Sequence, residues 1–178
     1  AGEVKIVSAI FLDRDGVINQ DLGYVSKWAN FHFCAGALDA LKVLSDKNVN
    51  IIIVTNQSGI ARGYYTEKDY NALTKNMLDV MNNHGVSISS VYHCPHYVKG
   101  DVVKYAVSCD CRKPKAGMIF KGLSTFSIKA ENAIMIGDRY SDELASKAAN
   151  LKFFYIDTKL KKQTPDRFNS LKECVEFI

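Results

Sequence analysis

The sequence lacks a hydrophobic run long enough to span a membrane, which needs roughly 20 apolar residues. Its N-terminus has no basic segment followed by an apolar stretch, the pattern of a secretory signal. Its lysines are scattered instead of interleaved with aromatic residues, so the net charge of +4 does not indicate a nucleic-acid-binding surface. We therefore expect a cytoplasmic protein whose partner is a small anionic molecule, and neither a membrane nor a nucleic acid.

Internal repeats, low-complexity segments and linkers are also absent, and strand and helix patterns alternate along the sequence. Buried strands are predicted over residues 6–12, 49–55, 86–92, 133–137 and 151–156, and helices over 36–47, 66–83, 114–125 and 141–149, with weak helical character near 171. A length of 178 residues suffices for one core and is short for two. We expect a monomer with a single α/β domain over residues 1–178: a doubly wound, Rossmann-like parallel sheet of about five strands with helices on both faces.

Three of the predicted strands end in polar residues. Asp13 and Asp15 follow the first strand, Thr55 and Asn56 close the second, and Asp138 follows the fourth. The carboxyl ends of parallel strands meet at one crevice, where open α/β sheets bind their ligands. Two carboxylates so close repel each other unless a cation lies between them, so the first pair indicates a bound metal. The alternative is an Asx turn that ends the strand.

These acidic residues suit phosphoryl transfer. Asp13 is the candidate nucleophile, which would form an aspartyl-phosphate and divide one hard displacement into two easier steps. Asp15 is placed to protonate the departing alkoxide and then to deprotonate the attacking water. Asp138 would complete an oxygen-rich site for Mg²⁺. Asp142 is interpreted instead as a first-turn acid that the helix dipole favours.

Further polar and basic residues suit phosphate oxygens. Thr55 and Asn56 offer a hydroxyl, an amide and backbone N–H groups, although either residue alone is as typical of a turn. Lys113 would neutralise charge on the transferring phosphoryl group, and Arg112 offers a planar fork for a second anion. A lone basic pair is more often solvated surface, but its position directly after Cys111 favours the functional interpretation.

Metal-ligand residues gather in one short segment. Three thiolates and one imidazole make a closed tetrahedral set for structural Zn²⁺: Cys94, His96, Cys109 and Cys111. The alternatives are unrelated cysteines, or an iron or copper site. The zinc loop, about residues 94–111, has no apolar periodicity, so we expect a metal to pin it. The isolated Cys34 and Cys174 are interpreted as packed small hydrophobes.

Four segments resemble the motifs of the haloacid dehalogenase superfamily of phosphotransferases: residues 11–19, 55–63, 109–114 and 137–139. The resemblance implies a nucleophile at Asp13 and an acid/base at Asp15, with Thr55 and Lys113 holding the phosphoryl group. It also implies Mg²⁺ held by Asp13, the backbone carbonyl of Asp15, and Asp138. No insertion is large enough for a cap domain, as in the capless members. The implied substrate-binding residues are Asp21, Leu22, Gly23, Tyr24, Asn56, Gln57, Ser58, Arg112 and Arg139.

Within the superfamily, the zinc loop and residues 55–63 are most similar to a group of Mg²⁺-dependent sugar-bisphosphate phosphatases. That similarity implies hydrolysis of the 7-phosphate of a heptose 1,7-bisphosphate, for heptose and lipopolysaccharide biosynthesis. Arg139 departs from the lysine expected in that group and is typical of histidinol-phosphate phosphatases, which stay as the alternative. Two other classes are a non-catalytic zinc-bearing interaction module and a nucleic-acid 3′-phosphatase, which should carry a basic, aromatic-rich groove that the sequence does not show.

Overall fold

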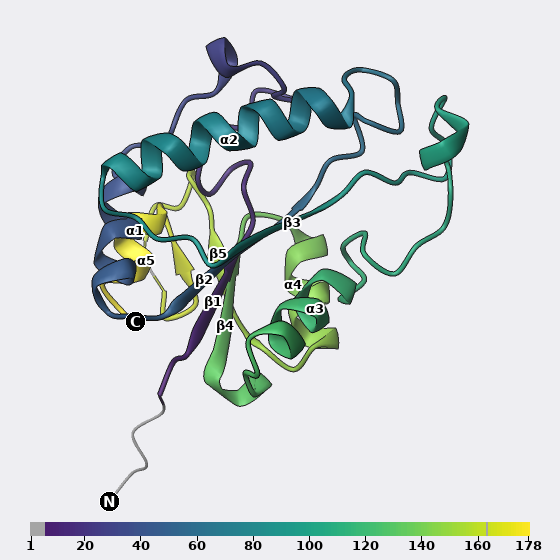
Figure 1. Cartoon of the computed structure of the whole chain (residues 1–178). Coiled ribbons are helices and arrows are strands. Elements are labelled where there is room, and N and C mark those ends of the chain that lie inside the picture. The colour runs from purple at the N-terminus through teal and green to yellow at the C-terminus, as the bar shows by residue number, and fades with distance from the viewer. Residues whose placement is uncertain (1–5, 163) are drawn as a thin grey trace, which may run out of the picture.

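The computed structural model describes residues 6–162 and 164–178, which contain a parallel sheet with helices on both sides (Figure 1). Its strands are β1 (Ala9–Leu12), β2 (Asn50–Asn56), β3 (Ser90–Cys94), β4 (Ala133–Gly137), β5 (Lys152–Ile156) and β6 (Arg167–Phe168). The α-helices are α1 (Ala37–Asp46), α2 (Glu67–Asn83), α3 (Gly117–Thr125), α4 (Tyr140–Ala148) and α5 (Leu171–Val175). Short 3₁₀ turns lie at Trp28–Asn30, Val103–Tyr105 and Ala130–Asn132. The doubly wound α/β fold predicted from the sequence is confirmed.

The strands lie in the order β3-β2-β1-β4-β5-β6, and every pair is parallel. Leu12, the last residue of β1, pairs with Ile53 of β2 on one side and Ile136 of β4 on the other. After β1, the chain adds β2 and β3 on one side of this strand, and then adds β4, β5 and β6 on the other side. The switch between β1 and β4 opens the crevice in which ligands of such sheets bind.

The central strand β1 is buried on both faces, and its four residues have no exposed surface. Ile10 and Leu12 belong to the core that α1, α2 and α5 cover, whereas Phe11 belongs to the core under α3 and α4. Figure 1 shows these two groups of helices on opposite sides of the sheet. Burial on both faces explains the continuous apolar run that predicted this strand.

Helix α2 begins directly after Thr66, the first residue of the helix predicted over residues 66–83. The Thr66 hydroxyl accepts a hydrogen bond from the backbone N–H of Asp69 at 3.1 Å. The Asp69 carboxylate accepts one from the backbone N–H of Thr66 at 3.0 Å in return. This reciprocal capping box satisfies two backbone donors at the helix start.

The sheet differs from the prediction in where two strands begin and in the number of strands. Strand β1 begins at Ala9, three residues after the predicted start at residue 6. Strand β3 begins at Ser90 instead of Val86, because the Val86 N–H bonds to the Met81 carbonyl at the end of α2 and is not free for the sheet. In the part of the chain that the structure describes, the sheet has six strands, where about five were predicted. The extra strand β6 has two residues, too few for any periodicity, and pairs with β5 through Ile156 and Phe168.

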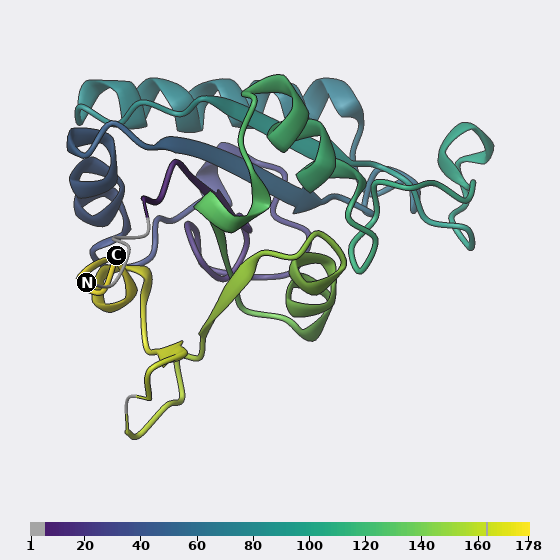
Figure 2. The same cartoon turned by 90° about the horizontal axis from the view of Figure 1, so that it is seen from below.

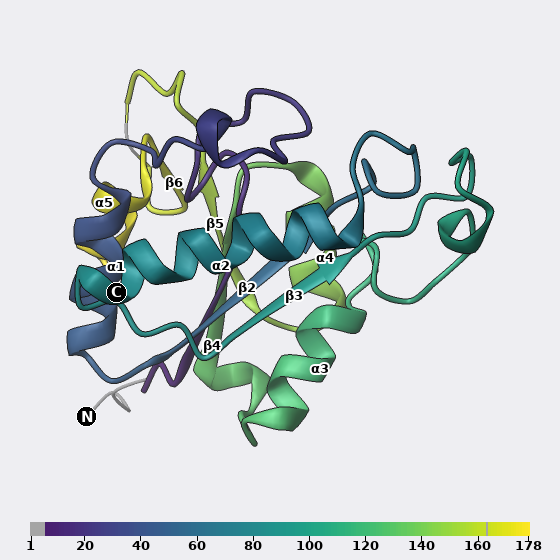
Figure 3. The ribbon, with the colours of Figure 1, turned by 45° about the horizontal axis from the view of Figure 1, so that its top comes forward.

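Irregular segments surround the carboxyl edge of the sheet. The flap, residues 17–30, contains only a short 3₁₀ turn. The zinc loop extends away from the sheet (Figure 2) and lies beside the loop that follows β2 (Figure 3), where the Val102 N–H bonds to the Ala61 carbonyl at 2.9 Å. Among the described residues, no helix has both the length and the apolar character needed to cross a membrane.

Candidate active site

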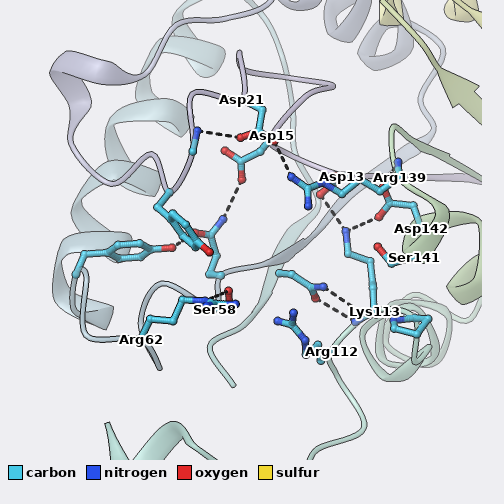
Figure 4. Close-up of a pocket in the computed structure, with 16 residues that line it drawn as sticks. Asp13, Asp15, Asp21, Ser58, Arg62, Arg112, Lys113, Arg139, Ser141 and Asp142 are labelled. Carbon is cyan, nitrogen blue, oxygen red and sulfur yellow. Dashed lines mark hydrogen bonds and ion pairs between the residues drawn. The ribbon is translucent and has the colours of Figure 1, made fainter. Parts of the chain in front are cut away.

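Asp13 follows β1 directly, and its N–H still bonds to the Ile136 carbonyl of β4 at 3.1 Å. The Lys113 ammonium group is buried beside Asp13. It donates to Asp13 Oδ1 at 2.9 Å and to the Val54 carbonyl at 2.8 Å. It also lies 2.7 Å from Asp142 Oδ1. The predicted nucleophile and the predicted phosphate-neutralising lysine are therefore in direct contact, as Figure 4 shows.

The acidic side chains here outnumber the cation. Asp13, Asp138 and Asp142 each present an oxygen within 4.8 Å of the others. Burial raises the pKa of Asp13 well above its usual value, and the neighbouring carboxylates raise it further against the opposing effect of Lys113. Burial likewise raises the pKa of Asp138. Burial alone would lower the pKa of Lys113, but Asp13 and Asp142 outweigh it and raise that pKa.

This arrangement fits a divalent cation. Three carboxylates against one ammonium group leave two negative charges unbalanced when all the groups are ionised. Asp138 Oδ1 is buried without a hydrogen-bond partner among the described residues. A side chain at Gly16 would place its Cβ 2.0 Å from Asp138 Oδ2, so only glycine leaves room there. A small, hard cation with oxygen ligands, such as Mg²⁺, suits this donor set.

The interpretation of Asp142 as a first-turn acid is confirmed, but it is incomplete. It does lie in the first turn of α4, where Oδ2 accepts from the backbone N–H groups of Asp138 and Arg139 at 3.2 and 3.1 Å. However, its side chain is 1% exposed, and its other oxygen pairs with Lys113. The residue is therefore part of the acidic cluster. Local sequence could not reveal this, because Lys113 lies on another segment.

The Asp15 side chain does not join that cluster. Its Oδ1 accepts from Arg14 Nη2 at 2.8 Å and from Asn19 Nδ2 at 2.9 Å, and its Oδ2 accepts from Gln57 Nε2 at 3.2 Å. Arg14 is 1% exposed and supplies the positive charge beside Asp15. The expectation that a metal balances the two carboxylates of the motif is corrected: a buried arginine pairs with Asp15, and the metal-like cluster forms around Asp13.

Hydrogen bonds fix the amide of Gln57. Its Oε1 accepts from the Tyr65 hydroxyl, and its Nε2 donates to Thr55 Oγ1 at 2.9 Å as well as to Asp15. Thr55 is fully buried beneath this network. Asn56 has a different task, since its amide bonds the backbone C=O and N–H of Lys113 at 3.1 and 3.0 Å. The end of β2 thus orients both Asp15 and Lys113.

A cavity of about 470 Å³ lies over these residues. Most of the predicted site residues line it: Asp13, Asp15, Asp21, Gly23, Tyr24, Asn56, Gln57, Ser58, Arg112, Lys113 and Arg139. Leu22, Thr55 and Asp138 are not among the lining residues, and Leu22 is 60% exposed. The prediction missed five lining residues: Arg62, Tyr65, Pro114, Ser141 and Asp142. Arg62 stands inside the segment 55–63 that carries the family resemblance, which is the one signal that could have marked it.

Arg139 lies at the rim of the cavity. Its Nη2 pairs with Asp21 Oδ2 on the flap at 2.8 Å. This pair joins the end of β4 to the flap. Arg139, which stands where a lysine was expected, therefore has an ion-pair partner within this protein. Its guanidinium group offers the fork geometry that a single ammonium group lacks.

The predicted zinc ligands come together in the structure. The Sγ atom of Cys94 lies 3.6 Å from Cys109 Sγ, 2.8 Å from Cys111 Sγ and 3.6 Å from His96 Nδ1. His96 Nδ1 lies 3.3 Å from Cys111 Sγ. Most of these separations approach the edge of a tetrahedron with metal–sulfur bonds of about 2.3 Å. All four residues can therefore hold one metal ion together.

The remaining cysteines lie apart from this cluster. Cys174 belongs to α5 and is fully buried in the core, as predicted for a packed small hydrophobe. Burial raises the pKa of its thiol to about 12, which suppresses thiolate reactivity. Cys34 is half-buried.

Known proteins resemble this one in sequence and in fold. Residues 12–169 match the family model described as polynucleotide kinase 3 phosphatase. The chain is 44% identical over 145 residues to D-glycero-beta-D-manno-heptose-1,7-bisphosphate 7-phosphatase of Haemophilus ducreyi, covering 81% of this chain and 79% of that one. It is 41% identical over 172 residues to D-glycero-alpha-D-manno-heptose-1,7-bisphosphate 7-phosphatase of Campylobacter jejuni, covering 96% and 95%. The crystal structure of D,D-heptose 1,7-bisphosphate phosphatase from B. bronchiseptica, complexed with magnesium and phosphate, superposes with a TM-score of 0.82 at 26% identity, covering 96% and 97%.

Proposed function

The chain belongs to the family of D-glycero-manno-heptose-1,7-bisphosphate 7-phosphatases, and we propose that it hydrolyses the 7-phosphate of a heptose 1,7-bisphosphate through an aspartyl-phosphate at Asp13. The observation that carries this proposal is the contact between Asp13 and Lys113 in the wall of a cavity that also presents Arg112. The region around Asp13 and Lys113 suits the phosphoryl group that reacts. The region around Arg112 offers a positive charge to the second phosphate of the substrate.

The reaction proceeds in two displacements. An oxygen of Asp13 attacks phosphorus, the bond between phosphorus and the C7 oxygen breaks, and Asp15 donates a proton to the departing alkoxide. Water then attacks the aspartyl-phosphate while Asp15 takes its proton, which releases inorganic phosphate and restores the Asp13 carboxylate. The Lys113 ammonium group, 2.9 Å from Asp13 Oδ1, offsets negative charge on the transferring group.

The hydrogen bonds around Asp15 support its role as acid and base. Arg14, Asn19 and Gln57 hold its carboxylate from three directions, and Gln57 is itself oriented by Tyr65. A proton-transfer group must keep its geometry through both steps, and such pre-orientation avoids reorganisation during the reaction.

Mg²⁺ would be held by Asp13, the backbone carbonyl of Asp15, and Asp138. The buried, unpartnered oxygen of Asp138 supports its place among the ligands. The ion would supply positive charge against the phosphoryl oxygens and the crowded carboxylates. Asp142 then has a supporting task, because it pairs with Lys113 and accepts from the backbone N–H of Asp138.

Zinc in the loop at 94–111 would act through geometry. Cys111 directly precedes Arg112, and the Arg112 guanidinium donates to the carbonyl of the ligand His96 at 3.4 Å.

We expect Cys109→Ser to lower the zinc content and to reduce kcat/KM by about 10-fold or more, because Arg112 and Lys113 would no longer be held in place by the metal-bound loop. Added Mg²⁺ should not restore the activity. Zinc analysis and kinetics on the same preparation test this, with Cys34→Ser as the control that keeps both. Full activity in a native protein without zinc would refute the structural role.

Arg112 is expected to receive the phosphate that is not transferred. A charge-assisted contact of this kind contributes about 1.5–3 kcal/mol, so Arg112→Ala should lower kcat/KM for the bisphosphate by about 10–150-fold. Heptose 7-phosphate has no second phosphate to lose, and its kcat/KM should change far less. Steady-state kinetics on both substrates decide the point: equal losses would mean that Arg112 serves the reacting phosphoryl group instead.

The proposal as a whole is tested by phosphate release from a small panel of substrates with Mg²⁺ present. The panel contains both anomers of heptose 1,7-bisphosphate, histidinol phosphate and a 3′-phosphorylated oligonucleotide. We expect kcat/KM to be highest for a heptose bisphosphate. Faster turnover of histidinol phosphate or of the oligonucleotide would overturn the substrate assignment.

A further inference from the structure

Arg62 and Arg112 stack on the same aromatic ring. The Cζ atom of Arg62 lies 4.0 Å from the centroid of the Tyr97 ring, and the Cζ atom of Arg112 lies 5.1 Å from it. Both arginines line the cavity. Arg62 follows β2 and Arg112 follows the zinc loop, so residues far apart in the sequence bring two guanidinium groups to one place.

The stack continues toward the flap. The Arg62 Cζ atom also lies 5.6 Å from the centroid of the Tyr24 ring, and Tyr24 packs edge-on against Tyr64 with ring centroids 4.8 Å apart. Tyr24 lines the cavity as well. Aromatic rings and guanidinium groups thus alternate along this wall, an arrangement that orients arginine side chains without using their N–H donors.

Hydrogen bonds anchor the stack. Tyr97 directly follows the zinc-ligand candidate His96, and the loop that carries it bonds to the Ala61 carbonyl through the Val102 N–H at 2.9 Å. Arg62 donates from Nε to the Ser58 hydroxyl at 3.2 Å. A folded zinc loop therefore sets the position of Tyr97 and, through it, of both arginines.

The described part of the chain offers no ion-pair partner for the two guanidinium groups. Among residues 6–162 and 164–178, no carboxylate forms an ion pair with Arg62 or Arg112. Both side chains are only partly exposed. Two partly buried cations that share one ring repel each other unless an anion joins them. In Figure 4 both arginines lie along the lower side of the cavity, below the point where the Lys113 ammonium group contacts Asp13 and Asp142.

We propose that Arg62 is a specificity-determining residue: together with Arg112, and oriented by Tyr97, it binds the phosphate of the substrate that is not transferred. This inference rests on the proposed function, since it requires a substrate with two phosphates. Planar guanidinium groups can each bond two phosphate oxygens, so two of them suit a phosphate dianion. Tyr97 is a positioning residue that need not touch the substrate.

The experiment measures kcat/KM for heptose 1,7-bisphosphate and for heptose 7-phosphate with a set of variants. Arg62→Ala should lower the value for the bisphosphate by about 10–150-fold and the value for the monophosphate by less than about 3-fold. Arg62→Lys keeps the positive charge but loses the planar guanidinium group, so it should keep only part of the preference for the bisphosphate over the monophosphate. Lys99→Ala removes an exposed positive charge from the same loop and should change neither value.

Tyr97 is tested by a matched pair of variants. Tyr97→Phe keeps the ring face and should retain the preference for the bisphosphate, whereas Tyr97→Leu should lose most of it, with the monophosphate little affected. If Tyr97 only supported the fold, Tyr97→Leu would lower kcat/KM for both substrates by the same factor. Zinc content and thermal midpoint, measured on every variant, show whether the loop is intact.

The outcomes separate this inference from the proposed function. A wild-type enzyme that does not prefer the bisphosphate contradicts the bisphosphate assignment itself. A wild-type preference that survives Arg62→Ala and Arg62→Lys, or equal losses on both substrates in folded, zinc-containing Arg62→Ala, overturns the role of Arg62 and leaves the function standing. A selective loss for the bisphosphate supports both.

Discussion

Asp13→Asn is expected to abolish turnover, by about 10⁴-fold or more, while the protein stays folded. An amide oxygen cannot form the acyl phosphate that a carboxylate forms. The asparagine Oδ1 can still accept the hydrogen bonds that Asp13 Oδ1 receives from Lys113 Nζ and from the Arg14 N–H, each at 2.9 Å. Burial and the neighbouring acids raise the pKa of Asp13, so removing its charge costs the fold little. Phosphate release with saturating Mg²⁺, together with circular dichroism, measures both effects.

The matched control is Asp39→Asn, an acid on the exposed surface of α1, which should keep the wild-type rate. A wild-type rate in Asp13→Asn with Mg²⁺ present would show that the reaction does not pass through this carboxylate. Loss of both activity and secondary structure would mean that the residue acts through the fold.

Lys113→Met should have the second-largest effect, because the lysine pairs with two buried carboxylates in addition to the role in phosphoryl transfer that we propose for it. Its ammonium group is 3% exposed and pairs with Asp13 and Asp142 at 2.9 and 2.7 Å. Without it, the phosphoryl group loses a fixed positive charge, which should lower kcat/KM by about 10²–10³-fold. Two buried carboxylates would also lose their partner, at a cost of about 3–5 kcal/mol in the free energy of unfolding of the metal-free protein.

Urea unfolding and steady-state kinetics, each with and without Mg²⁺, separate these two effects. Mg²⁺ should recover part of the stability, since it offsets the same carboxylates, but not the rate. The exposed Lys129→Met is the control and should change neither. If Mg²⁺ restored the activity of Lys113→Met to the wild-type value, the ammonium group would have no role in phosphoryl transfer.

The sheet and the acids that follow it could be predicted because they are local features. An apolar run buried on both faces predicts a central strand, and the next residue must emerge at the carboxyl edge. This reasoning placed Asp13 and Asp138 at one edge of the sheet, and the parallel pairing of β1 with β4 brings the two strand ends together there. The cap at Thr66 was predictable for the same reason, since its partner Asp69 lies three residues away.

The side-chain pairings across the site could not be predicted, because the tertiary fold decides them. Asp142 has every local feature of a first-turn acid, yet its buried partner Lys113 comes from the segment before α3. Arg14 has nothing in the sequence to distinguish it from a spacer between two acids, although burial makes it the partner of Asp15. The stack of Arg62 on Tyr97 joins two loops with no shared periodicity. For Asp142 with Lys113 and for Arg62 with Tyr97, the two partners are too far apart in the sequence for one window to contain both.

The most direct test of the proposed function is to identify the products of heptose 1,7-bisphosphate by ³¹P nuclear magnetic resonance during turnover with Mg²⁺. We expect the signal of the 7-phosphate to be replaced by inorganic phosphate while the signal of the phosphate on C1 persists. In the proposed arrangement, Asp13 and Lys113 would meet one end of the substrate and the arginine pair would hold the other. Loss of the C1 phosphate first, or loss of both signals at equal rates, would contradict the account.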